Sequence, residues 1–147
     1  MQMLYPKLSE ADILVFATPV YVPLPGEMQN VINRIVPIMD PVLKMRGGRT
    51  RARLRSDVRI RQMVLVSTSG WRELGNFGTV VRIIEELAKD CSVEFAGALL
   101  RPDASRMSLR KEKAEQIFES ARQAGYELVK NGKIPEDLLK TIGQALD

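Results

Sequence analysis

Three short runs of apolar residues are the strongest pattern along the chain. They read ILVFAT at 13–18, MVLVST at 63–68 and VEFAGALL at 93–100. Each is about as long as a strand and rich in β-branched side chains. None alternates cleanly between apolar and polar positions, which is typical of strands covered on both faces in a parallel sheet. We therefore predict strands over about 12–18, 62–68 and 93–100.

The segments between these runs carry apolar stripes at helical spacing. The first stripe comprises Met28, Val31, Ile32, Ile35 and Met39. The second comprises Val80, Val81, Ile84, Leu87 and Ala88. The third comprises Ala114, Ile117, Phe118, Ala121, Tyr126 and Val129. Each stripe predicts a helix, and Met3, Leu4 and Leu8 suggest a further helix before the first strand.

Local signals place the ends of these helices. Pro25 is expected in the first turn of the first helix, and Pro37 marks a kink or an end. The second helix is expected to close before Cys91. Ser108 is the expected N-cap of the third helix and Gly132 its expected stop. A short amphipathic tail is predicted over 133–147.

The order helix, strand, helix, strand, helix, strand, helix indicates the architecture. Such alternation implies right-handed crossovers and a parallel sheet, so we expect a single α/β domain over 1–147. The stretch 40–61 is the only segment that resembles a linker, and we expect it to form a basic loop.

Composition narrows the classes of function. Hydrophobic residues make up 45% and charged residues 27%, as in an ordinary globular domain. No apolar stretch reaches the roughly 18 residues that a membrane span needs. Cys91 is the only cysteine, which excludes an internal disulfide and makes the cytoplasm the default compartment. Since the chain has no histidine, its chemistry must come from carboxylates, hydroxyls, lysines or a bound cofactor. No metal site is implied.

The net charge of +4 is concentrated in one place. Residues 46–61 read RGGRTRARLRSDVRIR, with seven arginines and one acid. A solvated loop is the favoured interpretation of this run. A phosphate-bearing ligand, a subunit contact and nucleic acid are the alternatives, although the run has no aromatic side chain to stack on bases.

Ligands of open parallel sheets bind beyond the carboxyl ends of the strands. Three loops leave those ends here, at 18–27, 67–77 and 101–108. Tyr21 and Trp71 lie in the first two loops, where they would suit a flat aromatic ligand; packing of a lid and a dimer contact are the alternatives.

Arg101 is either a surface residue or a contact for a nicotinamide phosphate. Cys91 is interpreted as a small buried hydrophobe.

Three segments resemble one family. ADILVFATPVYVPLPGEMQNVINR at 11–34 resembles the third strand, loop and helix of the NADPH-dependent FMN reductase and multimeric flavodoxin superfamily. MVLVSTSGWRELGNF at 63–77 resembles the next strand with its flavin-contacting loop. FAGALLRPDA at 95–104 resembles the fifth strand and its exit. The resemblance implies a flavodoxin-like three-layer fold and an FMN-dependent NAD(P)H oxidoreductase of the quinone or flavin reductase type.

The resemblance also implies a set of flavin contacts and no catalytic side chain. Those contacts would be Thr18, Pro19, Val20, Tyr21, Val22, Thr68, Ser69, Gly70, Trp71, Asn76 and Phe77. NAD(P)H would be the electron donor and a small molecule the acceptor. The alternatives are a non-catalytic electron carrier or flavin-binding module, and an inactive remnant stabilised by oligomerisation.

The chain departs from the family pattern at its start. Family members begin with a strand and a phosphate-binding loop that hold the FMN phosphate, and no such segment precedes residue 11 here. We therefore expect an N-terminally truncated domain that binds FMN weakly. In the strand order 2-1-3-4-5 of the flavodoxin-like fold, the strand at 12–18 is the third strand and would normally pair with the first. Without the first strand, one apolar edge of 12–18 would be unpaired, which predicts a homo-oligomer.

Overall fold

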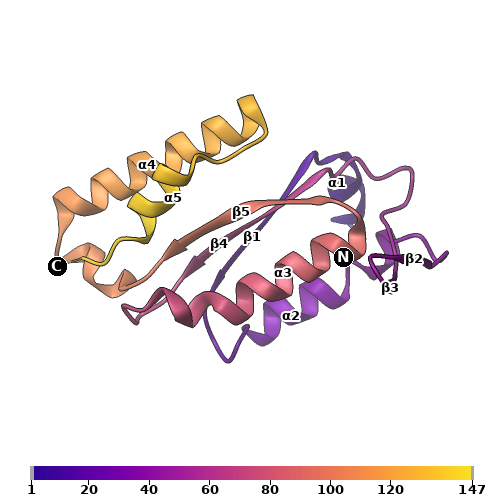
Figure 1. Cartoon of the computed structure of the whole chain (residues 1–147), viewed down its shortest axis with the longest axis horizontal. Helices are drawn as coiled ribbons and strands as arrows, with labels where there is room; N and C mark the ends of the chain where they lie inside the picture. Colours follow the sequence, from indigo (N-terminus) through magenta and orange to yellow (C-terminus); the bar gives the residue numbers. More distant parts are fainter. Residues whose placement is uncertain (1, 147) are drawn as a thin grey trace.

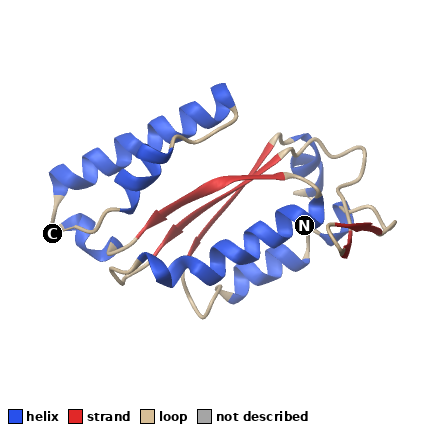
Figure 2. Ribbon diagram, viewed as in Figure 1, coloured by secondary structure: helices blue, strands red, loops and turns tan. Residues whose placement is uncertain are grey.

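The three predicted strands form one parallel sheet in the computed structural model, which describes residues 2–146 (Figures 1 and 2). The strands are β1 (Ile13–Pro19), β4 (Gln62–Thr68) and β5 (Glu94–Arg101). Their order across the sheet is β1-β4-β5, and both pairs are parallel. The predicted strands are confirmed to within one residue at each end.

Helices alternate with these strands as predicted. They are α1 (Tyr5–Glu10), α2 (Gly26–Asn33), α3 (Gly78–Cys91), α4 (Lys111–Asn131) and α5 (Glu136–Gly143). Short 3₁₀ turns lie at Val36–Ile38, Leu74–Phe77 and Ala104–Ser108. The chain is therefore an α/β fold with a parallel three-stranded sheet flanked by helices.

Several helix ends differ from the predictions by a few residues. The first helix ends at Asn33, four residues before Pro37, and Pro25 is its N-cap residue rather than part of its first turn. The second helix includes Cys91. Arg110, not Ser108, precedes α4, because a 3₁₀ turn takes up the segment between β5 and α4.

The helices cover the two faces of the sheet unequally. Figure 1 shows α2 and α3 on one face and α4 and α5 on the other. The main core lies under α2 and α3, around Phe16, Leu65 and Ile84. A smaller core joins α4 and α5 to β5, around Ile117 and Ile142. On the face that carries α4 and α5, these two helices therefore cover the side of the sheet at β5.

The segment expected to be a basic loop contains a β-hairpin, so that prediction is corrected. Strands β2 (Lys44–Arg46) and β3 (Arg49–Arg51) pair in antiparallel fashion. Gly47 and Gly48 form the two-residue turn with φ of 57° and 74°. Two consecutive positive φ angles are the requirement of the turn that matches the twist of a hairpin, and glycine adopts them without steric cost.

Five of the seven arginines of 46–61 pair with carboxylates of the same chain. Arg51 lies 2.7 Å from Asp90 and 3.3 Å from Glu86, which ties the hairpin to α3. Further ion pairs join Arg49 to Glu86, Arg53 to Asp40, Arg55 to Asp57 and Arg59 to Asp12. Much of the positive charge of this run is thus neutralised within the fold, which argues against a nucleic-acid interface.

Within residues 2–146, the helices are either too short or too polar to cross a bilayer.

Candidate functional site

The carboxyl ends of the three strands meet at one edge of the sheet. Pro19 pairs with Thr68, and Thr68 pairs with Arg101. The Val20 N–H donates to the Thr68 carbonyl oxygen at 2.8 Å, and the Ser69 N–H donates to the Arg101 carbonyl oxygen at 3.0 Å. The three loops predicted to carry the site therefore leave the sheet side by side.

Hydrogen bonds connect the second loop to the third. The Asp103 N–H donates to the Trp71 carbonyl oxygen at 2.8 Å, and the Ala104 N–H donates to the Ser69 carbonyl oxygen at 2.9 Å. The Ser69 hydroxyl in turn accepts from the Trp71 N–H at 3.1 Å. These bonds hold the backbone around Trp71 in one conformation.

A buried hydroxyl connects the second loop to the first. Ser67 Oγ donates to the Thr18 carbonyl oxygen at 2.7 Å. Ser67 and Thr18 are both buried. The turns that carry Tyr21 and Trp71 consequently begin from adjacent, hydrogen-bonded residues, as the sequence predicted.

An open groove of about 720 Å³ lies at the end of β1. It is lined by Ala17, Thr18, Pro19, Tyr21, Val22, Leu24, Pro25, Gly26, Glu27 and Met28. Most of these side chains are apolar, and Glu27 is the single carboxylate among them. The Val22–Pro23 peptide bond in this loop is cis. The groove can therefore hold a small, largely apolar ligand beside β1.

Four of the predicted flavin contacts line this groove: Thr18, Pro19, Tyr21 and Val22. Val20 packs against the main core instead. The remaining predicted contacts belong to the neighbouring loop and do not line the groove; they are Thr68, Ser69, Gly70, Trp71, Asn76 and Phe77. The structure thus brings the first loop around a concave surface and places the second loop next to it.

The two aromatic rings of the site are exposed. Tyr21 is 67% exposed and Trp71 is 61% exposed. Asn76 donates to the backbone oxygen of Glu73 at 3.0 Å, which places its amide within its own turn. Phe77 is fully buried and belongs to the main core. The prediction that Phe77 contacts a ligand is therefore corrected: its ring anchors the start of α3, where no ligand can reach it.

Arg101 is buried rather than a surface residue, with 5% of its area exposed. Its Nε donates to the Pro102 carbonyl oxygen and its Nη1 to the Ile142 carbonyl oxygen, both at 2.7 Å. Its Nη2 is buried without a hydrogen-bond partner among the described residues. Burial lowers the pKa of Arg101 from its ordinary value, while the charge of Asp103 opposes that shift.

Asp103 is a residue that the sequence reasoning passed over. It is 4% exposed and adopts a left-handed conformation with φ of 54°. Its Oδ2 lies 3.6 Å from Arg106 Nε and forms no hydrogen bond with the described residues. Arg101 ends β5 and Asp103 follows two residues later. Charged residues at the carboxyl end of an apolar strand are the signal that could have identified these two buried side chains.

A bound metal ion or a reactive thiol would be a further source of chemistry among the described residues. No group of three or more carboxylates, cysteines or histidines that could hold a metal ion occurs within residues 2–146. Cys91 is buried, and burial raises the pKa of its thiol to about 12. A thiol in this state is protonated at neutral pH and a poor nucleophile.

Comparisons with known proteins give no relative: no family model, no curated protein and no solved structure matches the chain.

Proposed function

We propose that this chain has a flavodoxin-like fold and carries the ring-binding part of a flavin site in an FMN-dependent NAD(P)H oxidoreductase of the quinone or flavin reductase type. The observation that carries this proposal is the hydrogen-bonded contact between the turns that follow β1 and β4, beside the groove that Tyr21 lines. Such a position, outside the carboxyl ends of parallel strands, is where open α/β sheets bind their ligands.

The strand order supports the flavodoxin-like assignment. In the order 2-1-3-4-5, the third, fourth and fifth strands are neighbours in sequence order and run parallel. The observed order β1-β4-β5 has the same arrangement. The assignment makes β1 the equivalent of the third strand of that fold.

The groove suits the flavin ring better than the flavin phosphate. Its volume lies within the roughly 300–1,000 Å³ of small-molecule sites, and Tyr21 offers an aromatic face for a planar ring. Glu27 lies in the first turn of α2, where its carboxylate repels a phosphate from the helix N-terminus. The chain is therefore expected to bind the ring of FMN and to add little affinity for the phosphate.

The flavin, when bound, supplies the hydride chemistry, and the protein supplies orientation and shielding from water. The backbone of Pro19 and Tyr21 would border the ring edge, and the exposed side chains of Tyr21 and Trp71 would cover its faces. The hydrogen bonds at Ser69 and Thr18 keep both turns in place without a ligand, which lowers the cost of ordering them on binding.

A titration of flavin fluorescence tests the site. We expect FMN and riboflavin to bind with affinities within about tenfold of each other, since the phosphate adds few contacts. Tyr21→Ala should weaken both by about tenfold, through loss of one aromatic contact. Tyr126→Ala, which removes an exposed tyrosine from α4, is the matched control and should leave binding unchanged. Equal loss in both variants would contradict the proposed site.

Rapid mixing with NADPH tests the reaction. If the chain is a reductase, we expect direct bleaching of the bound flavin when the chain, FMN and NADPH are mixed without oxygen. A non-catalytic electron carrier predicts flavin binding without bleaching. Absence of flavin binding in the titration would favour the inactive remnant instead.

A further inference from the structure

Strand β1 has one edge without a partner in the described structure. It pairs with β4 on one side only, and it is the first strand in the order β1-β4-β5. Val15, at its centre, lies on the face of the sheet opposite to Phe16, and its side chain is 50% exposed, whereas Phe16 is 3% exposed. An exposed apolar edge is a template for pairing with another strand.

The direction of the backbone groups on this edge follows from the bonds to β4. The Val20 N–H donates toward Thr68, and the Asp12 carbonyl oxygen accepts from the Arg61 N–H at 2.9 Å. Even-numbered residues thus direct their main-chain groups toward β4. Since successive residues of a strand point to opposite sides, Ile13, Val15 and Ala17 direct theirs toward the free edge.

We propose that this edge pairs with β1 of a second copy of the chain, antiparallel and with a two-fold axis at Val15. In that register Ile13 lies opposite Ala17 of the second copy, and Val15 lies opposite its own counterpart. The three outward residues all have an N–H group, so the two edges form about six main-chain hydrogen bonds. The large side chain of Ile13 meets the small side chain of Ala17, which gives the interface complementary shape.

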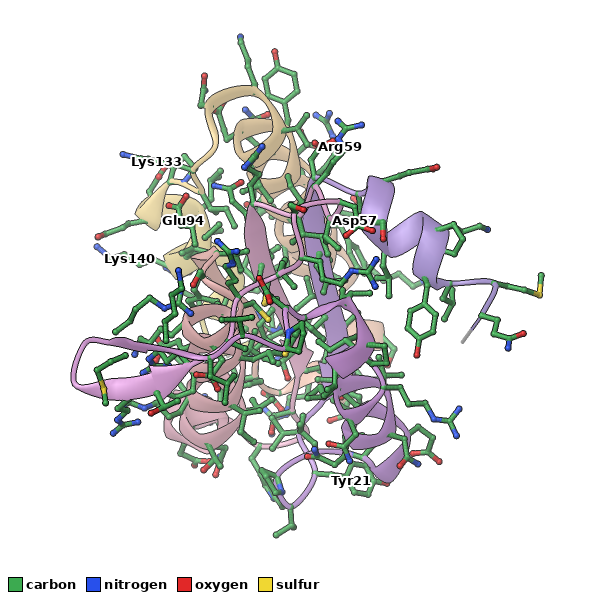
Figure 3. The ribbon with its side chains drawn as sticks, turned by 90° about the vertical axis from the view of Figure 1, so that its right-hand side faces the viewer. Tyr21, Asp57, Arg59, Glu94, Lys133 and Lys140 are labelled. Carbon is green, nitrogen blue, oxygen red and sulfur yellow. The ribbon has the colours of Figure 1, made fainter. Side chains whose placement is uncertain are left out.

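The flanks of β1 supply the area that strand pairing alone lacks. A stable interface buries roughly 800 Å² on each partner, more than one strand edge provides. Figure 3 shows α1 projecting beyond the free edge of β1. Exposed apolar side chains lie just before α1 and just beyond the carboxyl end of β1: Met3, Leu4, Tyr21 and Val22, with 87%, 47%, 67% and 96% of their area exposed. Because α1 projects past the edge, it reaches over the second copy.

The charges at the two ends of β1 suit the same arrangement. Tyr21 lies at one end of the molecule in Figure 3, and Arg59 lies at the other. The Tyr21 end carries the carboxylate of Glu27, and the opposite end carries the exposed side chains of Arg59 and Arg61. Arg59 is ion-paired with Asp12 of its own chain, so Arg61 is the cation that this end offers. An antiparallel pair brings the Arg61 end of the second copy toward the Glu27 end, and the symmetry repeats this attraction at the other end.

The second copy also completes the groove. Ala17, which lines the groove, belongs to the free edge of β1, so a paired strand covers the open side. The Arg61 end of the second copy then brings a cation toward the Tyr21 end, where the chain itself offers the carboxylate of Glu27. An anionic group on the ligand would gain its positively charged partner from the second copy. This role in ligand binding rests on the proposed function, whereas the pairing of β1 with a second copy does not.

The oligomeric state of the full chain, measured by light scattering over a range of concentrations without flavin, tests the pairing. We expect a dimer whose dissociation constant rises on the order of a hundredfold in Val15→Lys, because two like charges would face each other at the axis. Val129→Lys, at a position on α4 that is 78% exposed, is the matched control and should remain dimeric.

Amide hydrogen exchange identifies the surface used. In the dimer the N–H groups of Ile13, Val15 and Ala17 should exchange slowly, and they should become fast on dilution to the monomer. A chain that is monomeric at every concentration would overturn the proposal, as would a dimer that Val15→Lys leaves intact. Fast exchange of these three amides within the dimer would overturn it as well, since another surface would then hold the copies together.

Discussion

Arg101 is a charged side chain that the fold uses as a structural tie. It joins the end of β5 to the end of α5 through the Ile142 carbonyl oxygen, while Pro102 next to it is also buried. A guanidinium can hold two carbonyl oxygens at once because its N–H groups diverge in a fixed plane. The position of α5 over β5 therefore depends on this one residue as well as on apolar packing.

Substitution of Arg101 tests this role. Arg101→Ala should lower the free energy of unfolding by about 2–3 kcal/mol, because hydrogen bonds from a charged group contribute about 1.5–3 kcal/mol each and the lost desolvation cost offsets part of the sum. Arg34→Ala, at an exposed position after α2, is the control and should change it by less than about 0.5 kcal/mol. Urea denaturation of both variants provides the comparison; equal losses would argue against the tie.

Cys91 shows how the interior changes the chemistry of a single group. It is 1% exposed at the end of α3, and burial raises its thiol pKa to about 12. We expect a thiol reagent at pH 8 to leave the native chain unlabelled and to label it fully in denaturant. Native labelling at the denatured rate would show that the end of α3 opens readily.

At the scale of elements, ion pairs tie the hairpin of β2 and β3 to α3. Glu86 accepts from Lys89 at 2.8 Å and lies within 3.4 Å of both Arg49 and Arg51. The hydrogen bond from Lys89, followed by that from Arg51, lowers the pKa of Glu86 from 4.5 to about 2. The carboxylate form of Glu86 is thus the form that the fold favours.

The pH dependence of stability follows from this shift. A lowered pKa stabilises the folded state at pH above about 4.5, and that contribution disappears as the pH falls through about 2. Glu86→Gln should therefore lower the melting temperature at pH 6 and have little effect near pH 2. Glu115→Gln, an exposed change on α4, is the control. Circular dichroism melts at both pH values check the prediction; an equal effect of Glu86→Gln at both would contradict it.

Whole-molecule features explain which parts of the site a sequence can predict. The apolar runs determine three strands, and their alternation with helices determines a parallel sheet, because only a right-handed crossover returns each strand beside the last. The side-by-side placement of the Tyr21 and Trp71 turns follows from that topology. The groove beside Tyr21 does not follow, since its shape depends on how 18–27 folds back onto α2.

The sequence alone therefore determined the strands, the order of elements and the loops at the carboxyl edge, because hydrophobic periodicity and chain connectivity are local properties. Only the tertiary structure decided that Phe77 is a core residue, that Arg101 and Asp103 are buried, and that five of the seven arginines of 46–61 are paired. Each of these depends on which residues, distant in sequence, remove a side chain from water or meet its charge. The free edge of β1 depends on both the sequence and the tertiary structure. The apolar run predicts the strand, and the strand order decides which of its edges has no partner.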